Sequence, residues 1–163
     1  MTDVAWTFAR FAELSPADVH DLLRLRQDVF VIEQNCIFHE IDGRDPQAWH
    51  LLGRRGDDAH LVAYARVFEP GVTADEATIG RVVTDPSARG AGLGHALMRE
   101  AMAAVDRIAP GSAMRLAAQH HLQRFYAAYG FRGVGEKYIE DDIWHLDMVR
   151  PAQGAPDTGG PAA

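Results

Sequence analysis

A run of closely spaced glycines near the middle of the chain constrains the fold and the chemistry more than any other feature. Gly90, Gly92 and Gly94 follow Arg89, after a strand-like stretch at residues 77–84 and at the start of a helix-like stretch at residues 92–105. The first N–H groups of a helix have no partner within it, and the helix dipole places partial positive charge there. The run therefore predicts a binding site for a phosphorylated cofactor.

Two common phosphate-binding loops do not fit this run. A Walker loop needs a lysine after its glycines, and none follows here, which excludes a phosphate-loop nucleotide hydrolase. A dinucleotide-binding loop needs G-x-G-x-x-G, but His95 stands where the third glycine would follow Gly90 and Gly92. A start at Gly92 fails in the same way, because Leu97 takes the last glycine position.

The run instead resembles the acyl-CoA loop of the GNAT acetyltransferases, R/Q-x-x-G-x-G/A. A second hallmark of that family, an aromatic–Tyr-x-x-x-Gly-Phe ending, is matched at residues 125–131, in the family's order and at about its separation. Segments at residues 26–36, 40–43, 50–53, 63–66 and 118–126 resemble the ElaA branch of the superfamily. The resemblance implies an α/β GNAT fold: a single mixed, mostly antiparallel sheet flanked by helices, with a splayed pair of central strands at residues 77–84 and 114–118.

Local patterns predict elements in the order that this fold needs. Ser15, Pro16 and Asp18 form a helix start, and apolar residues at helical spacing carry this helix to about residue 31. A polar loop at residues 33–47 follows. The other predicted helices span residues 92–105 and 120–129, and the predicted strands span residues 4–8, 49–54, 60–68, 77–84, 114–118, 131–138 and 143–149.

Length and composition predict one compact cytoplasmic domain. The 163 residues divide into a domain at residues 1–150 and a Pro/Gly/Ala-rich tail at residues 151–163 that we expect to be disordered. No apolar run reaches the roughly 18 residues of a membrane span, and the start of the chain does not have the pattern of a signal peptide. The net charge of −7 argues against nucleic acid, and a single cysteine, Cys36, suits a reducing cytoplasm.

The resemblance assigns acetyl-CoA as the co-substrate and gives its contacts. The pyrophosphate would be held by Arg89, Gly90, Ala91, Gly92, Leu93 and Gly94. The backbones of Val82 and Val83 would hold the pantetheine and polarise the thioester, and Gln119 is a further candidate contact. Tyr126 would contact the cofactor and protonate the leaving thiolate, unless it is only a core tyrosine under Phe131.

The general base and the acceptor site are less defined. Candidate bases are Glu33, His50 and His121, although Glu33 could be a solvated helix-end carboxylate and His50 a structural histidine. Candidate acceptor contacts are Gln34, Asp42, Tyr64, Arg66 and His121. Cys36 is a poor candidate for a nucleophile because the family commonly uses direct transfer, and one cysteine does not suggest a structural zinc site, so we expect no metal.

The function predicted from these residues is N-acyl transfer from acetyl-CoA to a small-molecule or peptide amine in a ternary complex. The acidic loops at residues 33–47 and 138–143 suit a cationic amine, but they equally describe solvated loops. The alternative is a non-catalytic acyl-CoA-binding module that regulates a partner. The resemblance is also compatible with a homodimer, which no residue pattern indicates.

Overall fold

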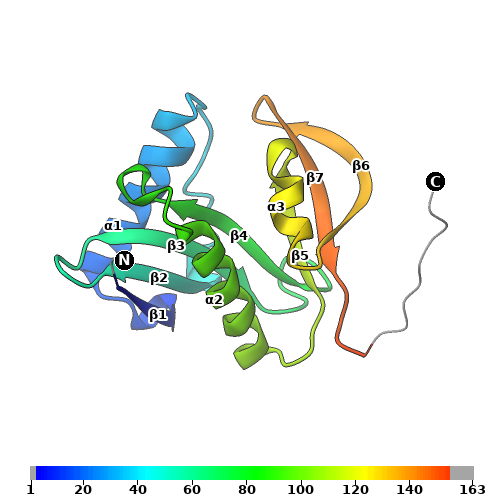
Figure 1. Ribbon diagram of the computed structural model, residues 1–163, viewed down its shortest axis with the longest axis horizontal. Coiled ribbons are helices and arrows are strands. Elements are labelled where there is room, and N and C mark those ends of the chain that lie inside the picture. Colours follow the sequence, from blue (N-terminus) through cyan, green and yellow to red (C-terminus); the bar gives the residue numbers. More distant parts are fainter. Residues whose placement is uncertain (1–2, 155–163) are drawn as a thin grey trace.

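A computed structural model describes residues 3–154 of the protein. In that part of the chain a seven-stranded sheet has the order β1-β2-β3-β4-β5-β7-β6 (Figure 1). All neighbouring pairs are antiparallel except β4 and β5. The strands are β1 (Val4–Arg10), β2 (Trp49–Arg55), β3 (Leu61–Phe68), β4 (Ala77–Thr84), β5 (Met114–Gln119), β6 (Arg132–Glu140) and β7 (Ile143–Arg150). This arrangement confirms the predicted mixed, mostly antiparallel sheet.

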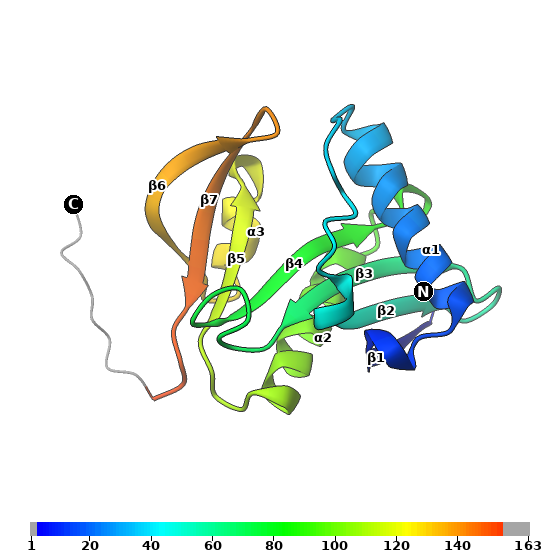
Figure 2. The same ribbon diagram turned by 180° about the vertical axis from the view of Figure 1, so that it is seen from behind.

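Helices cover both faces of the sheet (Figures 1 and 2). On one face, α1 (Pro16–Arg26) packs Leu22 and Leu25 against Leu52, Tyr64 and Val83 of the strands. On the other face lie α2 (Leu93–Ile108) and the short α3 (Gln123–Ala127). Because β3 is covered on both sides, every one of its residues is buried.

The helix starts follow the sequence signals, and the helix ends differ in detail. Ser15 accepts a hydrogen bond from the Asp18 amide and closes a capping box at the start of α1, as predicted. The helical path continues past Arg26 as a π-helix, η2 (Gln27–Glu33). The predicted helix at residues 120–129 is divided into a 3-10 turn, η5 (His120–Leu122), and α3, and Gly130 at φ 88° follows its end.

The two central strands separate as expected. β4 and β5 pair only at Ala77–Met114 and Thr78–Arg115, where their paths begin. Beyond that point a register shift lies between β3 and β4, and Arg81 takes a left-handed backbone conformation at φ 49°. A bulge of this kind bends a strand away from its neighbour. The second half of β4 therefore leaves β5, which confirms the predicted splayed pair.

The end of the chain is described only in part. Gln153 donates its backbone N–H to the Gly111 carbonyl at 3.0 Å. The rest of the predicted tail, residues 155–163, lies outside the described residues. Within residues 3–154, no helix is long and apolar enough to cross a membrane.

Candidate active site

The glycine run forms an open helix N-terminus. Gly92 is the N-cap of α2 at φ 77°, and Gly90 has φ 91°, conformations that other residues adopt only with strain. No side chain caps this end, and a Cβ at either glycine would meet nothing within 4 Å. The uncapped N–H groups and the open backbone fit a pyrophosphate group. The neighbouring Leu93 has its side chain in the core, so its main chain is the part available to a ligand.

Arg89 and Glu33, for which the sequence predicted separate roles, form an ion pair. Nη1 of Arg89 lies 2.7 Å from Oε1 of Glu33, and Nη2 donates to the Thr84 carbonyl at 3.2 Å. Both side chains are 41% exposed. The pair joins the end of η2 to the start of the glycine run, so Glu33 lies beside the candidate pyrophosphate site.

A cleft of about 780 Å³ opens where β4 leaves β5. Its walls come from the loop between η2 and β2, from β3, β4, β5 and β7, and from the end of β6. Predicted site residues that line it are Gln34, Asp42, Arg66, Val82, Gln119 and Tyr126. Gln119 and Gln34 also meet each other across the cleft at 3.4 Å between Nε2 and Oε1.

Tyr126 is both a core residue and a cleft residue. Its ring packs edge-on against Phe125 and Phe131, with 5.1 Å and 6.4 Å between ring centroids. Tyr126 nevertheless also lines the cleft. No hydrogen bond to its hydroxyl is present within residues 3–154. Burial raises the pKa of Tyr126 to about 12, so the phenol keeps its proton at neutral pH.

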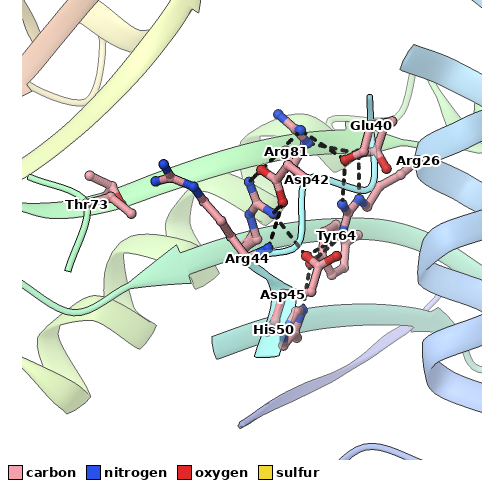
Figure 3. Close-up of polar contacts among 11 residues, drawn as sticks. Arg26, Glu40, Asp42, Arg44, Asp45, His50, Tyr64, Thr73 and Arg81 are labelled. Carbon is pink, nitrogen blue, oxygen red and sulfur yellow. Dashed lines mark hydrogen bonds and ion pairs between the residues drawn. The ribbon is translucent and has the colours of Figure 1, made fainter. Parts of the chain in front are cut away.

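The loop at residues 33–47 is attached to the sheet by a buried charge network (Figure 3). Arg26, at the end of α1, is fully buried and contacts Glu40 and Asp45, each at 2.7 Å. Glu40 also binds Arg81 at 2.8 Å, which joins the loop to the β4 bulge. The predicted polar loop therefore holds two buried carboxylates, because arginines from α1 and the strands neutralise them.

Arg66 and Asp42 belong to the same network. Two nitrogens of Arg66 contact the Asp42 carboxylate, each at 2.8 Å, and Nη1 also contacts Asp45 at 3.0 Å. Burial alone would raise the pKa of Asp42, but the hydrogen bonds from Arg66 and the Arg44 amide hold it well below its usual range. Arg66, a candidate acceptor contact from the sequence, is thus buried and ion-paired.

His50 and Tyr64 lie behind the network, outside the cleft. His50 is fully buried, with Nδ1 2.7 Å from the Tyr64 hydroxyl and Nε2 2.9 Å from the Asp45 carbonyl oxygen. Burial lowers the pKa of His50, and neither ring nitrogen is left for a substrate. This geometry matches the structural alternative for His50, and Tyr64, also fully buried, supports the loop rather than the acceptor.

The remaining candidates are dispersed. His121 is exposed on η5 and does not line the cleft, and Glu33 and Val83 do not line it either. Val83 instead packs under α1.

The cleft lining also includes residues that were not selected from the sequence, among them His39, Arg44, Arg81 and His145. Arg44 extends away from the charge network toward Thr73 (Figure 3). His145 is placed by its register with Gln119, which is visible only once β5 and β7 are known to be neighbours.

Comparison with known proteins agrees with this geometry. The family model described as "Acetyltransferase (GNAT) domain" matches residues 47–151. The chain belongs to the GNAT acetyltransferase superfamily. Within it, the chain is 39% identical to protein ElaA of Escherichia coli, over 90% of this chain and 96% of that protein. It is 40% identical to a UPF0039 protein of Synechocystis, over 90% and 95%.

Solved GNAT structures superpose on most of the chain. An acyl-CoA N-acyltransferase from Pseudomonas aeruginosa has a TM-score of 0.87 and 43% identity, covering 91% of this chain and 99% of that one. The E. coli ElaA structure has a TM-score of 0.83 and 38% identity, with the same coverage. The fold and the family are thus those of acyltransferases, a class that generally binds acyl-CoA.

Proposed function

We propose that the protein is an N-acyltransferase that moves an acetyl group from acetyl-CoA to a primary amine by direct transfer in a ternary complex. The observation that carries the proposal is the cleft at the separation of β4 and β5, onto which Val82, Gln119 and Tyr126 all open. In this mechanism the open N-terminus of α2 binds the pyrophosphate through the backbone of residues 89–94. The unpaired edge of β4 at Val82 and Val83 holds the pantetheine.

Each residue has a limited task in this mechanism. Main-chain N–H groups of the β4 bulge would stabilise negative charge on the thioester oxygen, which is commonly the largest catalytic contribution. The amine nitrogen bonds to the carbonyl carbon, the carbon–sulfur bond breaks, and the thiolate takes a proton from the Tyr126 hydroxyl. The nitrogen then loses a proton, which restores the Tyr126 hydroxyl. Its raised pKa keeps Tyr126 in the protonated form, which is the form that a proton donor needs at the start of the reaction.

Cys36 supports direct transfer rather than an acyl-enzyme. Its thiol donates to the Asp141 carbonyl at 3.3 Å. Partial burial, followed by the carboxylates of Asp141 and Asp142, raises the pKa of that thiol. A thiol that keeps its proton is a weak nucleophile.

The acceptor site is proposed on Gln34, Asp42 and Arg66. The carboxylates of the loop at residues 33–47 are poor support for a cationic acceptor, because arginines already neutralise Glu33, Glu40, Asp42 and Asp45. A small-molecule amine and a peptide amine both remain candidates, and the single thiol fits a cytoplasmic site of action.

Calorimetric titration with acetyl-CoA, with CoA and ATP as controls, tests the proposal first. We expect micromolar binding of acetyl-CoA and no binding of ATP, followed by acetylation within a pool of primary amines. Binding without transfer to any amine would favour the regulatory module instead. No binding of any CoA species would refute the assignment of the glycine loop.

A further inference from the structure

A row of three side chains crosses the cleft side of the sheet. His145, on β7, is directly opposite Gln119 of β5 on one side and Tyr138 of β6 on the other. Residues that face each other across neighbouring strands project from the same face of a sheet. His145 therefore shares a face with Gln119, and it lines the same cleft as Gln119 and Tyr126.

The position of the His145 ring is held by its neighbour on β6. The ring stacks on Tyr138 with 5.8 Å between centroids and an interplanar angle of 17°. Tyr138 is in turn fixed by its hydroxyl, which donates to Asp147 at 2.6 Å. A ring held in this way has little freedom to turn, and such preorganisation favours a catalytic group.

One hydrogen bond determines which ring nitrogen of His145 carries the proton. Nδ1 lies 2.8 Å from the carbonyl oxygen of Ile143. A carbonyl oxygen can only accept, so Nδ1 must be the donor, and in the neutral ring Nε2 is left with its lone pair. Within residues 3–154, no side chain or backbone group is hydrogen-bonded to that Nε2.

We propose, on the basis of the function proposed above, that His145 is the general base of the reaction. Nε2 first takes a proton from the ammonium form of the acceptor, and the neutral nitrogen then bonds to the thioester carbon as the carbon–sulfur bond breaks. Tyr126 protonates the departing thiolate and regains a proton from the product nitrogen, and the proton on His145 goes to solvent. An imidazole suits this task because its free nitrogen can accept a proton and release it to solvent. His145 has what the three bases selected from the sequence lack: a place in the cleft and a nitrogen free to accept a proton.

The decisive variant is His145→Asn. The asparagine amide can still donate to the Ile143 carbonyl, but it provides no base. With ethylamine, which is mostly protonated at neutral pH, we expect kcat to fall by roughly 10²-fold. With hydroxylamine, which is mostly neutral there, we expect a loss of less than about threefold. The Kd for acetyl-CoA should stay unchanged in this variant, and both Kd and kcat should stay unchanged in the control His20→Gln, an exposed histidine on α1.

Equal losses with both amines would overturn the proposal, because they would indicate misplacement of the acceptor rather than a missing base. A fall in kcat in His39→Gln with no fall in His145→Asn would also overturn the proposal. It would assign the role of base to His39, the exposed histidine of the loop. If the wild type binds no acetyl-CoA, the failure belongs to the proposed function instead.

A second measurement needs no turnover. Long-range ¹⁵N–¹H NMR of the histidine-labelled protein should show neutral His145 with the proton on Nδ1 and a bare Nε2. Finding the proton on Nε2 would refute the proposal whether or not either amine is acylated.

Discussion

Oε1 of Glu40 lies 2.8 Å from Nε of Arg81, so a carboxylate of the loop at residues 33–47 binds the residue that forms the β4 bulge. The same oxygen is 2.7 Å from Nε of Arg26 at the end of α1 (Figure 3). One buried oxygen thus joins α1, the loop and the strand that separates from β5. The shape of the cleft and the shape of the bulge are therefore coupled.

We expect Glu40→Gln to destabilise the fold by about 3 kcal/mol, because removing one partner of a buried ion pair leaves the other charges uncompensated. The acylation rate should also fall, because the β4 bulge would change shape. Thermal unfolding measures the first effect and steady-state kinetics the second. The control is Asp57→Asn in the exposed pair with Arg55, where Asp57 is 70% exposed. It should change the free energy of unfolding by less than about 0.5 kcal/mol. Equal stability of the two variants would show that the network contributes little.

For Tyr126→Phe we expect kcat to fall by roughly 10²-fold or more, while acetyl-CoA still binds, because only the donated proton is lost. The matched control is Tyr129→Phe, since the Tyr129 hydroxyl contacts His95 outside the cleft. Unchanged turnover in Tyr126→Phe would remove this residue from the mechanism.

The pH dependence of turnover offers a separate test of Tyr126. Because burial raises its pKa to about 12, the phenol remains protonated through the ordinary assay range. The wild-type rate should therefore show no loss due to Tyr126 below about pH 10. If a fall below that pH disappears in Tyr126→Phe, the phenol titrates earlier than its burial implies.

The parts of the site that depend on local sequence were predictable, and the parts that depend on distant strands were not. The glycines at residues 90–94 and the pattern at residues 125–131 are contiguous signals, and they are sufficient to indicate the phosphate loop and Tyr126. His145 carries no such signal. Its place in the cleft depends on β5 and β7 being neighbours, although 23 residues lie between Gln119 at the end of β5 and Ile143 at the start of β7.

Buried charge is the second reason why the structure differs from what the sequence predicted. In the sequence, the loop at residues 33–47 has the pattern of a solvated polar segment, and His50 could be either a base or a structural histidine. In the structure, Arg26 and Arg66 bring Glu40 and Asp45 into the interior, and His50 is enclosed with them. Sequence patterns do not show which arginine will meet which carboxylate, because these partners are 14 to 21 residues apart.

The conformation of Gly92 gives a prediction about cofactor binding by the glycine run at residues 90–94. At φ 77° an alanine is strained, so Gly92→Ala should cost about 1 kcal/mol of stability and weaken acetyl-CoA binding by tilting the N–H groups of α2. Gly71→Ala is the control, since Gly71 has φ 84° and equally open surroundings, away from the loop. Calorimetry should show weaker binding only in Gly92→Ala. Equal affinities of the two variants for acetyl-CoA would show that the glycine run does not bind the cofactor.

Acid should destabilise the fold through Asp45. Burial by itself would raise the pKa of Asp45, but the hydrogen bonds and charges of Arg26 and Arg66 outweigh it and hold the pKa below the usual value. An aspartate in the unfolded chain titrates near about 3.9. The stabilisation from this group is therefore complete above about pH 4 and is lost as pH falls through the lower folded-state pKa.

Asp45→Asn tests this assignment. The variant should be less stable at neutral pH, and its free energy of unfolding should depend less on pH below about pH 4 than that of the wild type. Urea unfolding at a series of acid pH values measures the slope. Identical slopes for the two proteins would place the acid sensitivity in other carboxylates.

Glu33→Gln distinguishes the two roles open to that carboxylate. Because Glu33 and Arg89 are both 41% exposed, their ion pair should contribute no more than about 1 kcal/mol to stability. Releasing Arg89 should leave the affinity for acetyl-CoA unchanged or tighter, whereas Arg89→Ala should weaken it. Since Glu33 lies outside the cleft, kcat should fall by less than about threefold, which steady-state kinetics will show. A loss of more than about 30-fold at unchanged acetyl-CoA affinity would instead identify Glu33 as the base and would contradict the assignment of His145.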